Sequence, residues 1–329
     1  MKFLGVLLLI VLLAVAVAGY VIYAPLGPNT EKFVDIAPRT GTAAIGRQLE
    51  ESGVIRSRYG FDLLHIVKHG TLKAGEYRFN HAVPMTEVYA RIVRGDVYVV
   101  SLKIPEGYNI FDIAQAVAAA GLGSRDAFLA AEQQHTELLS WIPQEGRPPQ
   151  SLEGYLFPDT YHFSRHATPV QMLTAMVRRF RQVSTLLQLN GDVQRTVTMA
   201  SLVEKEVNQD SERPLVAGVF TNRLAQGMPL ATDPTVIYAA LLEGRWRGAI
   251  YASDLQSTSP YNTYKHTGLP PGPICNPGIA SLRAAMAPAQ TDYLYFVSDA
   301  AGHSRFSTDL KEHNQQVQAY RQAQKTQGR

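Results

Sequence analysis

The stretch 200–207, ASLVEKEV, places two glutamates in a segment that otherwise has the apolar pattern of a buried helix. At about 100° per residue, four apolar side chains share one helical face: Met199, Leu202, Val203 and Val207. Glu206 falls within this face, whereas Glu204 lies on the flank and is expected at the solvent-exposed edge. The sequence therefore predicts that Glu206 is the carboxylate on the buried side of the helix.

A carboxylate on an apolar face needs a reason, because an unpaired charge is costly to bury. Burial raises the pKa of a carboxyl group, and a carboxyl that stays protonated near neutral pH can act as a general acid. The alternative is a structural ion pair between Glu206 and one of the arginines. The periodicity of the helix leaves both interpretations open.

Two further tracts combine turn-forming residues with polar side chains. In MPLATDPTVIYAA, Thr232 and Asp233 precede a proline, which is typical of a turn that leads into a helix. The tract 259–278, SPYNTYKHTGLPPGPICNPG, contains five prolines and three glycines and cannot form a regular element. Its tyrosines favour a rigid loop over a disordered linker. Amides and hydroxyls beside aromatic faces would suit a sugar chain.

The N-terminus predicts a membrane anchor. After Lys2, residues Phe3 to Ala24 carry no charge, and about 20 apolar residues suffice to cross a bilayer as a helix. A cleaved signal peptide is the alternative, because Ala16 to Ala18 resembles a cleavage site. The apolar run continues beyond that site to Tyr23, which favours the retained anchor. The rest of the chain would then lie outside the membrane.

The 329 residues are 46% hydrophobic and 18% charged, which is a globular composition with room for two domains and an anchor. The helix and strand patterns predict an α+β fold. We expect a stub and transmembrane helix over 1–24, a linker over 25–32, a small α+β subdomain over 33–95 and a larger α+β catalytic domain over 96–329.

Within the small subdomain the pattern is helix, helix, strand and helix. The first helix carries Ile45 and Leu49 and ends near Gly53. The second carries Phe61, Leu64 and Ile66 and is expected to end at Gly70. In the larger domain, Ser211 is the expected N-cap of a helix that has Pro214 in its first turn.

Several classes of function find no support in the sequence. The single cysteine, Cys275, excludes an intrachain disulfide and a cysteine-based zinc site. The nine histidines include no HExxH motif, so no metal is expected. Gly-rich phosphate loops and GxSxG elbows are also missing. The net charge of +3 comes without a Lys/Arg run, so nucleic acid is not an expected partner.

The tracts described above also occur together, in the same order, in a known family. The sequence resembles the MltG (YceG-like) family of endolytic murein transglycosylases. The matching pieces are EGYLFPDTY (153–161), ASLVEKE (200–206), TDPTVIY (232–238), YNTY (261–264), TGLPPGPI (267–274) and NPG (276–278). Each piece alone is a weak signal, but together they span more than half of the chain and are highly specific.

The resemblance implies a membrane anchor, a LysM-like subdomain and a YceG-like catalytic domain that needs no cofactor. The last residue of ASLVEKE, Glu206, would be the catalytic acid and base. The resemblance also places five residues at the glycan substrate: Thr232, Asp233, Tyr238, Asn262 and Tyr264. The implied reaction is lyase cleavage of the MurNAc-β-1,4-GlcNAc bond in nascent peptidoglycan, which gives 1,6-anhydroMurNAc ends and terminates glycan elongation.

The implied location is the inner (cytoplasmic) membrane, crossed once, with the catalytic domain on the periplasmic side and peptidoglycan synthases as further partners. Two other functions stay open. A hydrolytic muramidase would cleave the same bond with Asp233 as the second carboxylate that hydrolysis usually requires. A non-catalytic peptidoglycan-binding scaffold would use the same loops, although it would gain nothing from a carboxylate on an apolar face.

Overall fold

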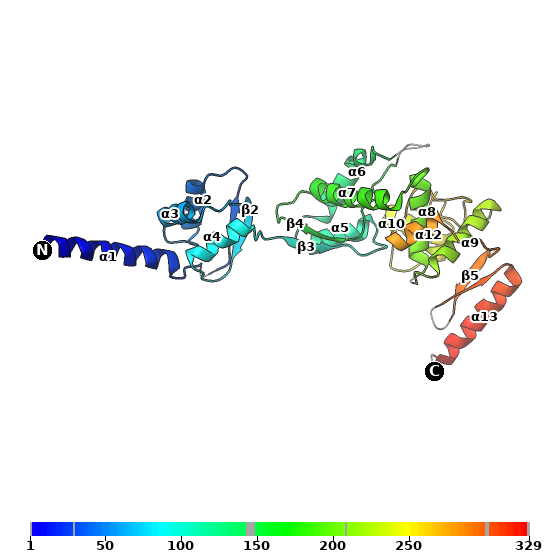
Figure 1. The fold of residues 1–329 in the computed structure, drawn as a ribbon. Helices are drawn as coiled ribbons and strands as arrows, with labels where there is room; N and C mark the ends of the chain where they lie inside the picture. The colour runs from blue at the N-terminus through cyan, green and yellow to red at the C-terminus, as the bar shows by residue number, and fades with distance from the viewer. Residues whose placement is uncertain (1, 29, 143–148, 208, 300–302, 328–329) are drawn as a thin grey trace. The chain divides into compact units, whose positions relative to one another are not determined.

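The computed structural model describes residues 2–28, 30–142, 149–207, 209–299 and 303–327. The chain divides into two compact units, Met1–Val100 and Ser101–Arg329, and the division falls at the start of strand β3. Both units combine helices with a small number of short strands (Figure 1). The expected α+β class is confirmed.

The first unit is built around a two-stranded antiparallel sheet, in which Val34 of one strand is paired with Tyr77 of the other. Its elements are α1 (Lys2–Tyr23), β1 (Lys32–Ile36), α2 (Thr42–Glu51), α3 (Arg58–Lys68), β2 (Gly75–Phe79) and α4 (Met85–Arg94). Glycines end two of the helices: Gly53 follows α2 with φ 69°, and Gly95 caps α4 with φ 78°. Both lie in the left-handed region that glycine adopts without strain.

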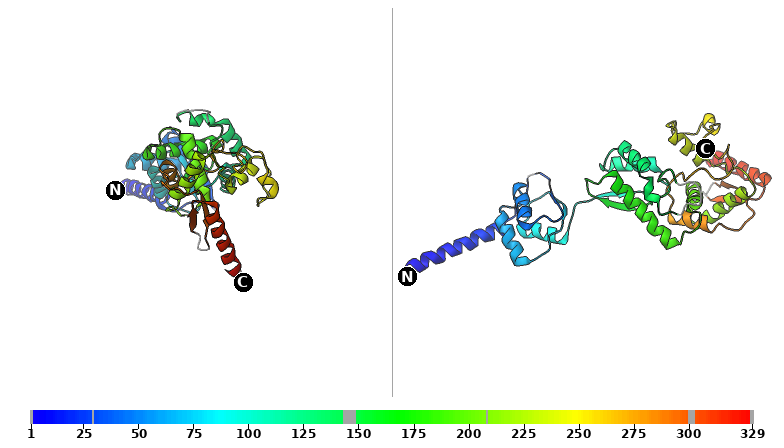
Figure 2. Two further views of the ribbon diagram at one scale, coloured as in Figure 1. Left: turned by 90° about the vertical axis from the view of Figure 1, so that its right-hand side faces the viewer. Right: turned by 90° about the horizontal axis from the view of Figure 1, so that it is seen from above.

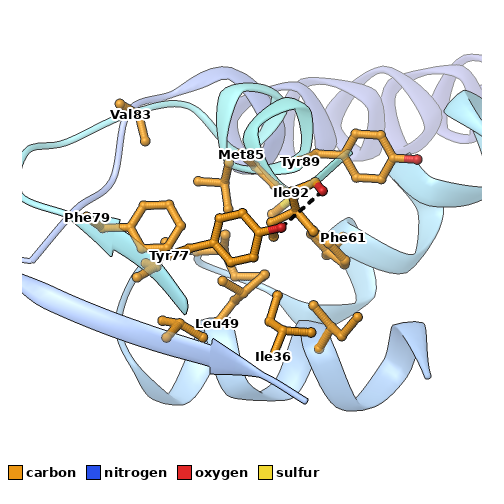
Figure 3. Close-up of a cluster of buried hydrophobic side chains, with 14 of the residues drawn as sticks. Ile36, Leu49, Phe61, Tyr77, Phe79, Val83, Met85, Tyr89 and Ile92 are labelled. Atoms are coloured by element: carbon orange, nitrogen blue, oxygen red, sulfur yellow. Dashed lines mark hydrogen bonds between the residues drawn. The ribbon is translucent and has the colours of Figure 1, made fainter. Parts of the chain in front are cut away.

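The core of the first unit lies between this sheet and the three helices that follow α1 (Figure 3). Leu49, Phe61 and Ile92 come from α2, α3 and α4 respectively and are fully buried. Tyr77 reaches into the same core from β2, and its hydroxyl donates hydrogen bonds to the carbonyls of Lys73 (2.9 Å) and Ile92 (3.3 Å). The polar end of this tyrosine is therefore satisfied within the core.

Helix α1 is long and apolar enough to cross a membrane from Phe3 to Tyr23. Its last turn is part of the first unit, because Val21 and Ile22 pack against the core described above. Figure 2 shows α1 running as one straight helix into this unit. The apolar helix and the unit that follows it are thus joined by packing as well as by the chain.

The second unit contains two separate two-stranded sheets among nine described α-helices and one short 3₁₀ helix. Its elements are β3 (Val100–Lys103), α5 (Ile110–Ala119), α6 (Arg125–Gln134), η1 (Thr136–Leu139), β4 (Thr160–Phe163), α7 (Pro169–Leu187), α8 (Val193–Glu206), α9 (Arg213–Ala225), α10 (Asp233–Leu242), α11 (Ala252–Leu255), α12 (Ile279–Met286), β5 (Tyr295–Ser298), β6 (Ser304–Ser307) and α13 (Leu310–Gln327). Helix α13 packs on the β5–β6 hairpin (Figures 1 and 2).

Local capping signals explain several of these boundaries. Asn109 and Asp112 form a reciprocal capping box at the start of α5, and Thr168 and Gln171 do the same at the start of α7. Pro169 occupies the first turn of α7, where its missing N–H has no helical partner to lose.

The structure differs from the expected elements in three places. Strand β1 was not expected, because KFVDI is short and has a weak alternation. Helix α3 ends at Lys68 and is capped by His69 in the left-handed conformation, one residue before Gly70. The N-cap of α9 is Glu212, one residue after Ser211.

Candidate active site

Helix α8 is surrounded by protein on most of its circumference. It packs against α9, α10 and α12, and its third turn is buried on every side, from Thr198 through Val203. The four apolar residues expected on one face all belong to a single core cluster: Met199, Leu202, Val203 and Val207. A helix that is apolar around its circumference is typical of a buried central element.

Glu206 is the last residue of α8, and the chain becomes extended at Val207. Burial is the main cause of a raised pKa at Glu206, and the nearby carboxylate of Asp233 raises it further. The Thr232 hydroxyl and the Arg223 guanidinium act in the opposite direction. The negative end of the helix dipole also disfavours a charge at this position. Glu206 is therefore more readily protonated than an ordinary glutamate.

Thr232 and Asp233 stand at the start of α10, where two contacts with the proline-rich loop hold the backbone. The Thr263 hydroxyl accepts a hydrogen bond from the N–H of Thr232 (3.1 Å), and the Thr263 carbonyl accepts one from the N–H of Ala231 (3.1 Å). Ala231 has φ 48°, a left-handed conformation that is strained for a residue with a Cβ. The Thr232 Oγ1 is buried, and its interaction with the Glu206 carboxyl lowers the pKa of that carboxyl.

Tyr264 joins this group from the proline-rich loop. Its hydroxyl donates a 2.8 Å hydrogen bond to Asp233 Oδ1. Burial and the hydrogen bond to Asp233 raise the pKa of Tyr264, so the phenol stays protonated and remains a donor. The structure thus brings together four of the residues expected at the site: Glu206, Thr232, Asp233 and Tyr264.

Asn262 lies in the same loop but faces its interior. It is fully buried, and its amide donates to the carbonyls of Leu255 (3.2 Å) and Ser257 (2.8 Å) while its Oδ1 accepts the N–H of Tyr264 (3.1 Å). Its side chain is therefore occupied within the loop and positions Tyr264. The loop is ordered by such contacts, as expected of a rigid loop and not of a linker.

Glu204 is not at the solvent edge, and that expectation was wrong. Its side chain is 6% exposed and forms an ion pair with Arg213 of α9 at 3.1 Å; Arg213 is equally buried. Its second oxygen accepts the N–H of Gly278 (2.9 Å) at the start of α12. A helical wheel of α8 alone cannot show these partners, because α9 and α12 cover the flank that would otherwise face water.

Gly278 illustrates how tightly this corner is packed. A Cβ at Gly278 would overlap the carboxyl group of Glu106. Burial and the charge of Glu204 raise the pKa of Glu106. The two carboxylates lie at the N-terminus of α12, where the helix dipole favours negative charge. A side chain at position 278 would displace the Glu106 carboxyl from this place.

A second buried carboxyl, which the sequence did not reveal, is Glu153 of the EGYLFPDTY motif. It is 1% exposed and accepts hydrogen bonds from the Ile110 N–H (2.9 Å) and the Asn276 amide (2.9 Å). Burial raises the pKa of Glu153 to about 8. The position lies in a loop without periodicity, so a helical-face argument could not find it.

Tyr238, which was expected to contact the substrate, lies beside Glu153. It is buried, and its hydroxyl interacts with the Glu153 carboxyl. Its ring packs on Tyr261 with centroids 5.1 Å apart. Glu153 and Tyr261 also line a cavity of about 320 Å³ together with Pro271, Gly272 and Pro273.

Arg223 of α9 is a further residue near the site that the sequence did not single out. Its guanidinium donates to the carbonyls of Leu230 (2.8 Å) and Leu294 (2.7 Å), and it stacks over the ring of Tyr295. Its charge lowers the pKa of both Glu206 and Tyr264. Only the NRLAQG helix pattern marked this region, and that pattern gives no indication of which way the arginine points.

Comparison with known protein families gives the class to which a protein with these helices, this loop and this carboxyl belongs. The chain belongs to the YceG-like family, whose model matches residues 34–319. The family resemblance inferred from the motifs is thereby confirmed.

Two curated relatives carry the same name, endolytic murein transglycosylase. The protein of Bacillus subtilis (strain 168) is 34% identical over 305 residues, which cover 87% of this chain and 84% of the relative. The protein of Streptococcus pneumoniae serotype 2 (strain D39) is 31% identical over 329 residues, which cover 89% of this chain and 59% of the relative. This chain therefore corresponds to just over half of the longer streptococcal protein.

A crystal structure of a YceG-like protein from Listeria monocytogenes matches with a TM-score of 0.57 and 32% sequence identity. The match covers 88% of this chain and 99% of the Listeria chain. The similarity thus extends over both units and not only over the region around Glu206.

Proposed function

We propose that this protein is an endolytic transglycosylase of peptidoglycan, with Glu206 as its catalytic acid and base. The enzyme class follows from family membership, since the curated relatives are endolytic murein transglycosylases. The observation that supports the catalytic assignment is a carboxyl of raised pKa at the end of α8, close to Thr232, Asp233 and Arg223.

The chemistry requires one group that first donates a proton and then accepts one. Protonated Glu206 donates its proton to the glycosidic oxygen that links N-acetylmuramic acid to N-acetylglucosamine, and this oxygen departs with the N-acetylglucosamine. The carboxylate then takes the proton of the muramic acid C6 hydroxyl as that oxygen attacks C1. The product is a 1,6-anhydro end, and no water is consumed. A single carboxyl is sufficient because the substrate provides the nucleophile.

The surrounding groups suit a polar sugar substrate. The Thr232 hydroxyl is buried and interacts with the Glu206 carboxyl, so it can hold that carboxyl in position for the sugar. Tyr264 is 40% exposed and presents its ring beside Asp233. In this proposal Asp233 and Tyr264 orient the sugar, Asn262 holds the loop, and Tyr238 acts through Glu153.

The location of the enzyme is part of the proposal. The apolar helix from Phe3 to Tyr23 supports a single-pass anchor in the cytoplasmic membrane, with both units on the extracytoplasmic side. The order β1–α2–α3–β2 with its antiparallel strand pair supports the LysM-like assignment of the first unit. Such an enzyme would cut nascent strands near the membrane, terminate their elongation and act beside peptidoglycan synthases.

Product analysis tests the reaction. Purified glycan strands digested by the full-length enzyme should yield 1,6-anhydromuramoyl ends, which are lighter than hydrolytic ends by one water. Reducing muramic acid ends as the main product would instead identify a muramidase and make Asp233 the second carboxylate. Strand binding without any cleavage would favour the non-catalytic scaffold.

A further inference from the structure

One face of helix α3 is apolar and exposed. Four side chains on it are open to solvent to the extent of 49–68%: Tyr59, Leu63, Ile66 and Val67. At about 100° per residue they lie within an arc of roughly 100°, so they form one continuous strip along the helix. We call this strip the α3 strip. Single exposed apolar residues are common, but a contiguous strip of large ones usually marks a contact surface.

The opposite face of α3 is already occupied by the core of the unit. Phe61 and Leu64 are buried there. The strip is therefore not a displaced core face, and α3 is apolar on two separate sides. One side is covered by the protein, and the other is exposed.

Helix α1 runs beside the α3 strip. Gly60 lies on the wheel between the strip and the core face, and a Cβ on Gly60 would come within 3.1 Å of Val21 Cγ1. Helices α1 and α3 are in contact, and Figure 1 shows α3 at the end of the first unit from which α1 departs. The α3 strip thus flanks the last turn of the apolar helix.

The junction between α1 and the unit is held by Arg56. Its guanidinium stacks on the ring of Tyr20 at 4.8 Å and donates a 2.8 Å hydrogen bond to the carbonyl of Pro25. The carbonyl of Ala24 accepts a further hydrogen bond from the same group. These contacts, together with the packing of Val21, fix the direction in which α1 leaves the unit and so keep the strip beside it.

We propose that the α3 strip lies in the headgroup region of the same bilayer that α1 crosses. The inference rests on the proposed anchor. A helix that exposes an apolar face with an aromatic residue and also carries basic side chains is typical of a segment that lies in the membrane interface. Arg58 and Lys68 stand at the two ends of α3, where they can meet lipid phosphates. The first unit would then contact the membrane directly, through α3.

The geometry can be tested with the full-length chain in vesicles of phosphatidylcholine and phosphatidylglycerol. Single cysteines at Leu13, Ile66 and Arg78 would each carry a bimane label; Cys275 is fully buried and should not react. Lipids with a doxyl quencher either at mid-chain or near the headgroup then report the depth of each label. Arg78 belongs to β2, which Figure 1 shows away from α1, and serves as the control.

We expect mid-chain doxyl to quench the label at Leu13, headgroup-proximal doxyl to quench the label at Ile66, and neither to quench the label at Arg78. If Leu13 is quenched and Ile66 behaves like Arg78, the anchor stands and the inference about α3 is overturned. If Leu13 is not quenched, the anchor itself fails and the inference fails with it.

A second set of variants separates lipid contact from damage to the fold. Tyr59→Ser and Leu63→Ser change exposed side chains, so the unfolding temperature should stay that of the parent protein. In this background a label at Val67 should lose its quenching by headgroup-proximal doxyl if the strip is held by lipid. Unchanged quenching would overturn the proposal that the strip binds the bilayer. Asp35→Ser, an exposed change on β1, is the matched control and should leave the quenching at Val67 as it was.

Discussion

At the scale of single residues, two glutamates separated by one position have different chemistry because their partners differ. Glu204 is neutralised by Arg213, which is as deeply buried as Glu204 itself. Glu206 ends the helix beside another carboxylate, and its pKa is raised. A paired carboxylate stabilises the fold, whereas a carboxyl of raised pKa can deliver a proton.

Changing each glutamate to glutamine should therefore affect a different property: activity for Glu206 and stability for Glu204. Glu206→Gln keeps the shape but cannot donate the proton, so activity should fall by about 10²–10⁴-fold while the fold survives. Glu204→Gln removes half of a buried ion pair and should cost about 2 kcal/mol or more of stability, with measurable activity remaining. Turnover of glycan strands and the unfolding temperature, measured on both variants together, check this. An inactive Glu204→Gln beside an active Glu206→Gln would refute the assignment.

The pH dependence of the reaction gives an independent test of the same residue. The protonated carboxyl of Glu206 is the active acid, so activity should decline as pH rises through its raised pKa. Asp233 raises that pKa by its charge. In Asp233→Asn the alkaline limb of kcat/KM should therefore move to lower pH, while the Tyr264 hydroxyl can still donate to the new amide oxygen. Complete loss of activity at every pH would instead favour Asp233 as a second catalytic group.

At the scale of elements, Glu153 connects three segments that are far apart in the sequence. It is held between the N-terminus of α5 and the NPG loop, through Ile110 and Asn276, while its own loop continues into Tyr155 at the core. Asn276 in turn accepts the N–H of Leu156 (2.8 Å). The EGYLFPDTY and NPG motifs thus meet in one hydrogen-bond network.

Removing this carboxyl should destabilise the second unit. Glu153→Ala leaves two buried donors unpaired, which should cost about 2–5 kcal/mol by denaturant unfolding. Asn276→Ala disrupts the same network, so the two losses should be less than additive in the double variant. Strict additivity would show that the two residues do not act through a shared network.

The same carboxyl should make stability depend on pH. Its pKa is about 8 in the folded protein, against an ordinary value of about 4.5. The folded state therefore binds more protons than the unfolded state between these two values, and stability falls as pH rises across that interval. The stability difference between the parent protein and Glu153→Ala should be largest below about pH 4.5 and should shrink toward pH 8. Thermal unfolding at a series of pH values checks the direction.

The elements that were predicted from the sequence are those with local causes. The apolar face of α8 and the glycine after α2 follow from short-range pattern and backbone preference. Glu204, Glu153 and Arg223 could not be placed in this way, because their partners come from other helices and loops. The exposure of Ile66 could not be predicted for a related reason: α3 has two apolar faces, and periodicity cannot tell which one the protein covers.

At the scale of the whole molecule, the boundary between anchor and first unit does not fall at the end of the apolar run. Val21 and Ile22 are partly buried and pack against the core of the first unit, and Arg56 donates a hydrogen bond to the carbonyl of Ala24. The length of chain removed should therefore matter. A protein that begins at Gly19 keeps these contacts, whereas one that begins at Pro25 loses them.

Truncation tests this arrangement. Both shortened proteins should be soluble, but the one that begins at Pro25 should show a lower unfolding temperature for the first unit. Val21 and Ile22 are partly buried, so each should contribute less than the roughly 1.5–3 kcal/mol of a fully buried aliphatic side chain. The transition of the second unit should be the same in both and acts as the internal control. Equal unfolding temperatures for the first unit would mean that the last turn of α1 is not part of its core.

The left-handed residue before α10 has a consequence for the tolerance of this site to mutation. At helical and extended positions the backbone favours alanine over glycine, because glycine loses more conformational freedom on folding. At Ala231, where φ is 48°, the order should be reversed: glycine and asparagine should be accepted, and valine or isoleucine should be eliminated. A saturation library at position 231, selected for cell-wall cleavage, should therefore be enriched in glycine and asparagine. This backbone angle would set the preference, although the side chain of residue 231 performs no chemistry itself.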